Sequence, residues 1–468
     1  MSIARRKRMS VSSARSVSPL SPYAFQAALN PDMEEWVKAW ESVPARDLID
    51  SPVIAVDSDT SVEDACEALL SKNVTCIAIN RVPSESPHDT PYLGLFDYPD
   101  VNAFLTLAAT RHRWSPEELR GKPRTEEIIA AAKAGRVPVR LVSNLSEKNP
   151  LEVLPHDATI ISLLTIFSKG THRVLIRAPS PSDDFLGFVS DKSLLEWFTT
   201  AAQNSPTLGA YVSVSLSNLA LPSLYLYTSV IATKASDSVL DAMRLMSDYG
   251  VSSVAVIEEE GGNLLSAISV TDIGKIVVPS QSSQILSMPL HQLISLIKEP
   301  DGSTDGADKY PVYTVMPNNT LLYTMQKILA TNSHRLFVSD DHPTASPSGT
   351  GCLSGVVSIV DVLSLFGRLA NLPDVDPTAM QRHRRASSVS SESNGGPSGR
   401  SPDHYSFPRS RSSSRTGLTS SGSFVRKRTS VSSISVSPGL PASVSPGHIS
   451  HIPSLESMQT HWAERVPK

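Results

Sequence analysis

The sequence contains one pattern four times, and this repetition constrains the fold more than any other feature. Its clearest copy begins at residue 318 with NNTLLYTMQKILATNSHRLFVSD and ends with LSGVVSIVDVLSLF. Each copy has a short apolar strand, a helix that begins after a polar residue, two further strands and a second amphipathic helix. A single copy would leave apolar helix and sheet faces exposed, whereas two copies together bury both. The sequence therefore predicts a mixed α/β fold in which four units form two pairs.

The repeats divide the chain into domains and connecting segments. The four repeats are expected at residues 45–110, 146–202, 229–280 and 311–370. Between them lie a helical insertion at 111–145, a linker at 203–228 and a connector at 281–310. Within the insertion, Ser115 and Thr125 are the expected helix starts. A further amphipathic helix is predicted from Asp32 to Trp40, with its apolar side formed by Met33, Trp36, Val37 and Trp40.

Each repeat places a hydroxyl residue where its first helix needs an N-cap. These residues are Ser61, Thr159, Ser238 and Thr320. A side-chain oxygen at this position accepts a hydrogen bond from one of the backbone N–H groups that the first helical turn leaves unpaired. We therefore expect the first helix of each repeat to begin directly after this residue.

The two ends of the chain differ in composition from the middle. Residues 1–30 and 371–468 are rich in Ser, Arg and Pro and lack apolar periodicity, which predicts disorder. Residues 1–20 carry +5 and residues 377–468 carry +8, and since the whole chain carries -4, the middle carries -17. The sequence thus predicts an acidic folded core between two basic, disordered flanks.

Several features favour an intracellular protein. No apolar run approaches the ~20 residues that cross a bilayer, and no apolar stretch follows the basic N-terminus, so neither a membrane segment nor a secretory signal is expected. The three cysteines, Cys66, Cys76 and Cys352, lie in apolar surroundings and are expected to be reduced core residues. The expected location is the cytoplasm, the nucleus or both.

The joint between the last strand and the last helix of each repeat has a characteristic motif. With its Gly-x-x-Ser/Thr-x-x-Asp pattern, the unit resembles the CBS repeat, and four such units forming two CBS pairs are expected. His172-Arg173 and His334-Arg335 occur only in the second and fourth repeats, which is similar to the gamma subunit of AMP-activated kinase. That subunit lacks a long basic Ser/Pro tail, and the whole layout resembles more closely a fungal family of four-CBS-repeat regulators.

This resemblance implies a function. It implies a non-enzymatic regulator that binds and inhibits the catalytic subunit of a type 2A-like protein phosphatase. It also implies roles in cell separation, DNA replication and the response to nutrients and stress. The alternative is a gamma-like, energy-sensing subunit of a kinase complex that binds AMP or ATP. No cofactor is expected to be required.

The resemblance also implies a ligand, AMP, ADP or ATP, at the strand–helix joint. A carboxylate there accepts hydrogen bonds from both ribose hydroxyls, and a helix N-terminus favours phosphate. An ordinary helix cap has the same Ser-x-x-Asp pattern and remains the alternative reading. The motif is complete in repeat four, as Gly355, Ser358 and Asp361. Each of the other repeats departs from it at one position: repeat three has Ser266, Ser269 and Asp272, repeat one has Gly94, Asp97 and Asp100, and repeat two has Gly187, Ser190 and Ser193. The candidate ligand residues are Ser269, Asp272, Gly355, Ser358, Asp361 and Asp100.

The two His-Arg pairs are further candidates for ligand binding. By resemblance, His172, Arg173, His334 and Arg335 face the central space in which phosphates gather, where a guanidinium suits an anion. The alternatives are a salt bridge for each arginine and a packed position for each histidine. Lys192 is read as a solvated charge.

The flanks contain candidate phosphorylation sites. RKRMSVSSARSVSP at 6–19 and RKRTSVSSISVSP at 426–438 are nearly the same peptide. Basic residues before Ser suit basophilic kinases, and Ser-Pro suits proline-directed ones, so protein kinases acting on the tails are expected partners; the candidates are Ser10, Ser18, Ser387, Ser430 and Ser437. Phosphate would loosen a basic tail from an acidic core. The alternative is an unmodified solvated tail.

Catalytic and metal-binding motifs are absent from the sequence. It has no phosphate-cradling Gly-rich loop, no Gly-x-Ser-x-Gly elbow and no Cys/His zinc spacing, so neither an enzyme nor a metal site is expected. The basic runs suit nuclear import or weak nucleic-acid contact, but without interleaved aromatic residues they do not indicate specific nucleic-acid binding.

Overall fold

The computed structural model describes residues 32–81, 90–110, 122–179, 184–226, 229–260, 262–276, 282–298, 313–339, 353–373 and 375. All belong to the first of two compact units, residues 1–398 and 399–468. The N-terminal segment, nearly all of the C-terminal segment, Cys352 and every candidate phosphorylation site lie outside the described residues; these sites are Ser10, Ser18, Ser387, Ser430 and Ser437.

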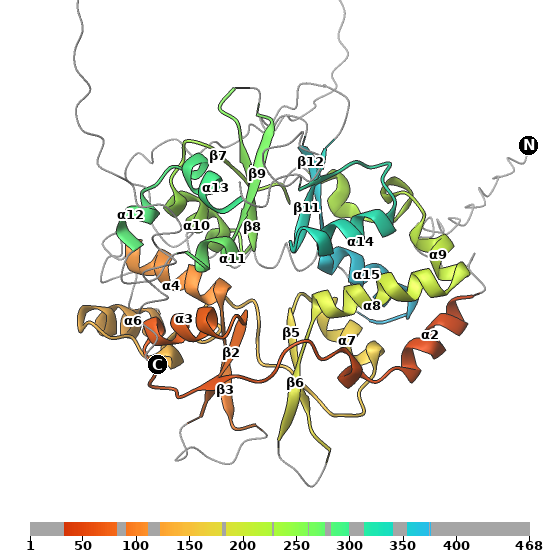
Figure 1. Ribbon diagram of the computed structural model, residues 1–468, viewed down its shortest axis with the longest axis horizontal. Helices are drawn as coiled ribbons and strands as arrows, with labels where there is room; N and C mark the ends of the chain where they lie inside the picture. The colour runs from red at the N-terminus through yellow and green to blue at the C-terminus, as the bar shows by residue number, and fades with distance from the viewer. Residues whose placement is uncertain are drawn as a thin grey trace, which may run out of the picture. The chain divides into compact units, whose positions relative to one another are not determined.

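Each repeat forms a three-stranded sheet with two helices (Figure 1). In every sheet the first strand is parallel to the second, across a helical crossover, and the second is antiparallel to the third. Repeat one comprises β1 (Ala55–Val56), α3 (Val62–Ser71), β2 (Cys76–Asn80), β3 (Tyr92–Asp97) and α4 (Tyr98–Thr110). Repeat two comprises β4 (Val153–Leu154), α7 (Ile160–Phe167), β5 (Arg173–Arg177), β6 (Phe185–Ser190) and α8 (Asp191–Asn204).

The other two repeats have the same element order. Repeat three comprises β7 (Ala232–Lys234), α10 (Val239–Asp248), β8 (Ser253–Ile257), β9 (Leu264–Ser269) and α11 (Val270–Gly274). Repeat four comprises β10 (Thr314–Val315), α14 (Leu321–Ala330), β11 (Arg335–Ser339), β12 (Leu353–Ser358) and α15 (Ile359–Leu369). The predicted mixed α/β class with four CBS repeats is confirmed.

The strand register shows that the four motifs are aligned in space as well as in sequence. In each antiparallel pair, the register shifts just after the position that faces the motif glycine or its replacement. The facing pairs are Ile79 with Gly94, Ile176 with Gly187, Val256 with Ser266, and Val338 with Gly355. The expected equivalence of Ser266 to the glycines is therefore correct.

The predicted caps begin the first helices. Ser61, Ser238 and Thr320 each accept a hydrogen bond from the backbone N–H three residues later. Thr159 occupies the same N-cap position before α7 without a side-chain cap bond. All four helices therefore begin where the sequence placed them.

The connecting segments include further helices. These are α2 (Met33–Ser42), η1 (Ala45–Leu48), α6 (Pro123–Lys133), η3 (Val139–Leu141), α9 (Pro206–Val212), η4 (Leu216–Asn218), η5 (Pro222–Tyr225), α12 (Ser282–Leu286) and α13 (Leu290–Lys298). In the insertion, the expected start at Thr125 was two residues late, because Pro123 occupies the first turn, where proline is pre-organised for a helix. The start expected at Ser115 lies outside the described residues.

The sheets pack in two pairs, as predicted. Cys76, Ala78 and Leu95 of repeat one pack with Leu175 and Phe188 of repeat two. Ala255 and Ala267 of repeat three join the cluster that contains Phe337 and Val356 of repeat four. Figure 1 shows these neighbours, with β2 and β3 beside β5 and β6 and with β8 and β9 beside β11 and β12.

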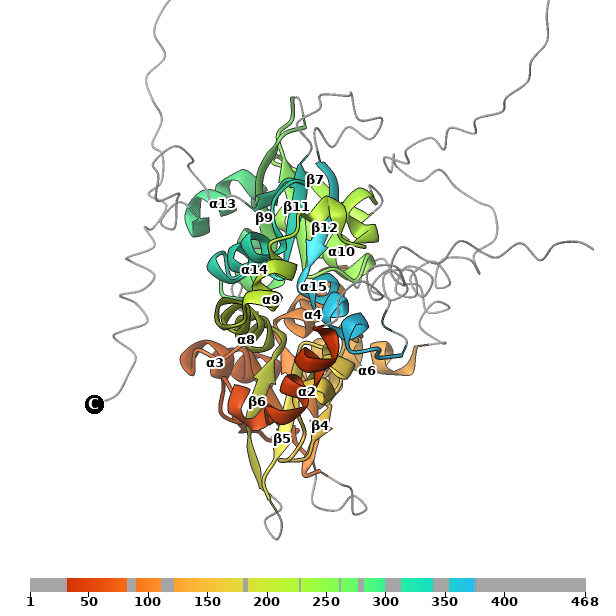
Figure 2. The same cartoon turned by 90° about the vertical axis from the view of Figure 1, so that its right-hand side faces the viewer.

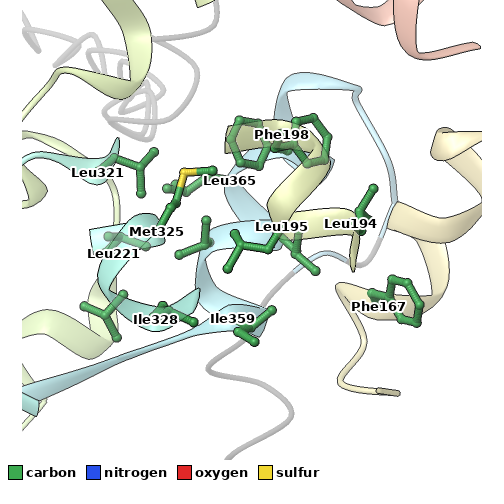
Figure 3. Packing of buried hydrophobic residues seen from close by; sticks show 14 of the residues in the cluster. Phe167, Leu194, Leu195, Phe198, Leu221, Leu321, Met325, Ile328, Ile359 and Leu365 are labelled. Carbon is green, nitrogen blue, oxygen red and sulfur yellow. The ribbon is translucent and has the colours of Figure 1, made fainter. Parts of the chain in front are cut away.

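Helices join one pair to the other. α4 of repeat one packs against α10 and α11 of repeat three, and α8 of repeat two packs against α14 and α15 of repeat four. In the second group the Phe198 and Phe366 rings stack with centroids 4.0 Å apart, and Trp40 of α2 meets both edge-on. Figure 2 shows α2 beside α15, and Figure 3 shows how Phe198, Leu195, Leu365 and Met325 fill the same cluster.

Two further observations concern the core and the surface. Cys66 and Cys76 are free and buried, as expected, and burial raises the pKa of the Cys66 thiol to about 12. Among the described residues, no helix is both long enough and apolar enough to span a membrane.

The packing of α8 on α15 leads to a stability prediction. Phe366→Ala removes a fully buried ring from the contact between repeats two and four. Loss of the ring and the resulting cavity are expected to lower the free energy of unfolding by about 3–5 kcal/mol, measured by urea unfolding. The control is Tyr323→Ala on the exposed side of α14, which should cost less than about 0.5 kcal/mol. Equal losses in the two variants would contradict this account of the core.

Candidate functional site

The complete motif of repeat four forms a helix cap with one unused acceptor. Ser358 N–H donates to Asp361 Oδ2 at 2.8 Å, and Asp361 N–H donates to Ser358 Oγ at 3.2 Å, which closes a capping box at the start of α15. Asp361 is only 1% exposed. Its other oxygen, Oδ1, has no hydrogen-bond partner among the described residues. The cap therefore uses half of a buried carboxylate.

A connecting segment covers this motif. A Cβ atom at Gly355 would lie 2.1 Å from the carbonyl oxygen of Leu224 in η5, so only glycine fits where η5 crosses β12. The neighbouring Ser223 hydroxyl is fully buried and also lacks a hydrogen-bond partner within the described part of the chain. Burial raises the pKa of Asp361, and Ser358, Ser223 and Arg335 oppose the increase. Within the described residues, the closed site thus holds two buried oxygen atoms, Asp361 Oδ1 and Ser223 Oγ, that lie near each other without forming a hydrogen bond of ordinary geometry.

Repeat three has the same capping box without the glycine. Ser269 N–H donates to Asp272 Oδ2 at 2.8 Å, and Asp272 N–H donates to Ser269 Oγ at 3.1 Å. Asp272 is half-buried, whereas Ser266 at the glycine position is buried and its hydroxyl has no hydrogen-bond partner among the described residues. The capping box is intact, but its aspartate is more exposed than Asp361 of repeat four.

In repeat one, the motif aspartate is hydrogen-bonded to backbone N–H groups of the segment that follows the repeat. Asp100 is buried, and its oxygens accept the backbone N–H groups of Asn144 at 3.1 Å and Ser146 at 2.9 Å. Burial raises the pKa of Asp100 well above its usual range, and the charge of Asp97 adds to the increase. A ribose would have to displace the 144–146 loop, so the geometry gives Asp100 a structural position.

Repeat two is closed in a similar way. Ser193, at the aspartate position, donates to the Leu48 carbonyl at 2.6 Å. Phe188 N–H of β6 donates to the Ser51 carbonyl at 2.8 Å, and Ser190 donates to Asp50. The segment after η1 therefore lies over β6 with its hydrogen bonds satisfied.

The two arginines of the His-Arg pairs lie at the start of β5 and β11. Arg173 is half-buried, donates to Thr75 and Ser51, and lies 3.9 Å from an Asp50 oxygen. Arg335 is half-buried and lies close enough to Asp361 to influence its pKa. Arg173 therefore already has partners on repeat one, and Arg335 lies near the repeat-four motif.

The two histidines of these pairs meet on one carboxylate. His172 Nδ1 lies 2.7 Å from Asp191 Oδ2, and His334 Nδ1 lies 3.6 Å from the same oxygen. The two imidazole rings are 5.0 Å apart. Asp191 is 1% exposed, and burial alone would raise its pKa, but the histidines hold that pKa below the usual range of an aspartate. Burial lowers the pKa of His334 to about 4, so its ring is neutral at neutral pH.

Lys192 is half-buried and paired, which differs from the solvated charge expected from the sequence. Its ammonium group donates to the Asn332 carbonyl at 2.8 Å, at the C-terminal end of α14, where the helix dipole favours a cation. Burial lowers the pKa of Lys192 to about 8. Lys192 therefore links α8 of repeat two to α14 of repeat four.

Asp191 is the residue that the motif analysis missed. The motif aligns Ser190 with Ser269 and Ser358, and it specifies only the residue three positions later. The residue directly after the motif serine could have indicated this site. Repeat two has Asp191 at this position, where the other repeats have the buried residues Tyr98, Val270 and Ile359. A carboxylate at a position that is otherwise apolar and buried indicates a special partner.

These four aligned units define a CBS-repeat protein. The family model for the CBS domain matches residues 45–83 and 226–278. The chain is 30% identical over 411 residues to Protein SDS23 of Yarrowia lipolytica, an alignment that covers 82% of this chain and 78% of that protein. It is 29% identical over 404 residues to Protein sds23 of Aspergillus niger, covering 75% and 77% of the two chains. The chain belongs to the Sds23 family.

Solved structures of CBS proteins are also similar. A Methanocaldococcus jannaschii protein, described as a proposed archaeal homologue of the gamma subunit of AMP-activated kinase, aligns with a TM-score of 0.47 and 15% identity. The alignment covers 69% of this chain and 100% of that one.

The buried carboxylates of repeat one lead to a pH prediction. Burial raises the pKa values of both Asp97 and Asp100 in the folded protein, so the folded state binds more protons than the unfolded state and stability falls as pH rises above about 4. Asp97→Ser supplies the hydroxyl that caps the equivalent helices and removes one of the two charges. The fall in the free energy of unfolding between about pH 4.5 and pH 7 should shrink by on the order of 1 kcal/mol.

Urea unfolding at the two pH values measures this difference. The lost Asn149 hydrogen bond to Asp97 favours the charged carboxylate, and its effect is already contained in the net rise of the Asp97 pKa. Asp157→Ser, at an exposed position, is the control. If the free energy of unfolding of Asp97→Ser falls as much between the two pH values as that of the wild type, the Asp97 charge does not oppose folding.

Proposed function

We propose that the chain is a non-enzymatic regulator that binds and inhibits a type 2A-like protein phosphatase and is tuned by an adenine nucleotide. Membership of the Sds23 family and the resemblance to fungal four-CBS-repeat regulators support the phosphatase part. The nucleotide part is supported above all by one observation: within the described part of the chain, Oδ1 of the buried Asp361 in the complete motif accepts no hydrogen bond of ordinary geometry.

The unpaired oxygen suits a ribose. A buried carboxylate oxygen without a hydrogen bond is destabilising, because it has lost its hydration without gaining a partner. Ribose hydroxyls would donate to Asp361 Oδ1, and Ser223 Oγ offers a further polar contact beside it. Arg335 supplies a cation near the motif that suits a phosphate. AMP, ADP and ATP share these features.

Movement of the covering segment η5 could couple nucleotide binding to a change in the rest of the protein. η5 lies directly on Gly355, so a nucleotide that reaches Asp361 must move η5. η5 belongs to the chain that connects repeat two to repeat three, and so connects the two CBS pairs. A ligand shifts such an equilibrium only by its difference in affinity for the closed and opened states. Repeat three, with Ser269 and Asp272, is the second candidate site.

The remaining parts of the proposal follow from the resemblance and the charge distribution. The regulator would act in cell separation, DNA replication and the response to nutrients and stress, in the cytoplasm and nucleus. Kinases that act on the basic flanks would change their attraction to the middle of the chain, which carries -17. We propose neither a nucleic acid nor a membrane as a specific partner.

A second candidate function is a gamma-like energy-sensing subunit of a kinase complex. One observation favours it: the His-Arg pairs of repeats two and four lie together, with the His172 and His334 rings 5.0 Å apart. In that case AMP or ATP would bind as above, but the protein partner would be a kinase.

Calorimetry with the full chain tests the nucleotide part. At least one of AMP, ADP and ATP should bind, and Asp361→Ala should weaken binding about tenfold or more, because the ribose loses a buried acceptor. The matched control is Asp241→Ala, which removes the same kind of capping box from α10. Absence of heat at millimolar ligand would reject nucleotide binding, and equal affinities in wild type and Asp361→Ala would leave Asp361 as a helix cap only.

An inhibition assay tests the phosphatase part. The full chain should inhibit a purified type 2A-like catalytic subunit in a saturable manner and leave a type 1 phosphatase unaffected. Loss of hydrolysis of a phosphopeptide is the measurement. Isolation of the native protein from cell extract then separates the two candidates, since co-purification of kinase alpha and beta subunits in place of a phosphatase would favour the gamma-like function.

A further inference from the structure

Three potential metal ligands converge between repeats two and four. His172 comes just before β5, Asp191 begins α8, and His334 comes just before β11. One ligand atom of each lies within 4.8 Å of the other two. Two independent observations indicate a missing partner: the buried Asp191 has an unpaired Oδ1, and His334 Nδ1 has no hydrogen bond among the described residues. We propose that His172, Asp191 and His334 bind a divalent first-row transition-metal ion.

The distances suit a small four-coordinate ion. Ligand bonds of about 2.0–2.2 Å in a tetrahedral site place neighbouring ligand atoms about 3.3 Å apart. The separation of 3.6 Å between His334 Nδ1 and Asp191 Oδ2 is already close to this value. The separation of 2.7 Å between His172 Nδ1 and Asp191 Oδ2 is a hydrogen bond, which must open slightly as the ion replaces the shared proton.

The charges at this point favour a cation over an anion. A phosphate held between the histidines would lie against the Asp191 carboxylate and be repelled by it. The unpaired Nδ1 of His334 and the Asp191 carboxylate can both offer lone pairs among the described residues, which a cation between them would satisfy together. Lys192 opposes a cation, but its ammonium group is held by the Asn332 carbonyl at the end of α14. Arg173 is held by Thr75 and Ser51.

The ligand types narrow the choice of metal. Two imidazoles and one carboxylate suit Zn²⁺, Fe²⁺, Co²⁺ and Ni²⁺ better than Mg²⁺ or Ca²⁺, which prefer oxygen ligands. Three protein ligands leave a fourth position for water. Sequence spacing could not indicate this site, because its ligands are separated by 19 and 143 residues and no two lie on one helix.

A bound ion would act as a clamp between the two CBS pairs. His172 and Asp191 belong to the first pair and His334 to the second. An ion that binds all three stabilises the folded arrangement in which α8 lies against α14. Metal availability would then change the stability of the contact between pairs even when no nucleotide is bound.

Zinc chloride added to the metal-free full chain tests the proposal. Zn²⁺ should raise the melting temperature, and Co²⁺ should give the visible absorption of a four-coordinate site. The test variants are Asp191→Asn, which keeps an acceptor for His172, and His334→Gln. Loss of an outer-shell partner already weakens metal affinity about 10- to 100-fold, so loss of a ligand should weaken the Zn²⁺ affinity of this site more than tenfold.

Matched controls separate this site from other zinc binding. His291→Gln changes an exposed histidine on α13, and Asp361→Ala changes the proposed nucleotide site; both should retain the Zn²⁺ response. The chain has twelve histidines, so the diagnostic result is one equivalent of tightly bound Zn²⁺ that the test variants lose. Circular dichroism checks that these variants fold.

Two results would overturn the proposal. The first is unchanged zinc stoichiometry and unchanged zinc-induced stabilisation in folded Asp191→Asn and His334→Gln. The second is an absence of any effect of Zn²⁺ on the wild type while inorganic phosphate stabilises it in a manner that depends on the two histidines, which would identify an anion site.

Discussion

The structure depends on one packing constraint: a CBS repeat cannot bury its own helices. The second helices of repeats two and four, α8 and α15, meet through the stacked rings of Phe198 and Phe366, and α4 of repeat one meets α10 and α11 of repeat three. Sheets pair within each half of the chain and helices pack between the halves. Every repeat therefore needs two neighbours, and residues at the helix starts are brought together from distant parts of the sequence.

The same constraint brings connecting segments onto the third strands. The chain after η1 lies on β6, Ser143 lies on β3 and η5 lies on β12, each against a glycine of the motif. In repeats one and two these contacts satisfy their polar groups, as with Asp100 and Ser193. In repeat four they leave Asp361 Oδ1 and Ser223 Oγ without a well-formed hydrogen bond among the residues that the structure describes. A covering segment whose polar groups are all hydrogen-bonded has a structural role. A covering segment that leaves polar groups unpaired can be displaced by a ligand with a smaller loss of free energy.

The sequence predicted what local chemistry determines. Ser61, Ser238 and Thr320 begin their helices, and the motif glycines and Ser266 occupy equivalent register positions, because caps and strand patterns depend on nearby residues. It could not reveal that the 144–146 loop would occupy Asp100 or that Asp191 would meet two histidines. Those contacts join residues 44, 19 and 143 positions apart, and their geometry is set by the packing of whole repeats.

The two proposed sites share one strand pair in repeat four. His334 precedes Arg335, which pairs with Ser358 across β11 and β12, and the His334 carbonyl accepts the N–H of Ile359 at the start of α15. Asp361 lies two residues further along that helix. A shift of β11 against β12 would therefore change the position of the metal ligand relative to the ribose acceptor. If each ligand prefers one arrangement of these strands, the effect of the metal ion on nucleotide affinity must equal that of the nucleotide on metal affinity. Regulation by one ligand then cannot be described without the other.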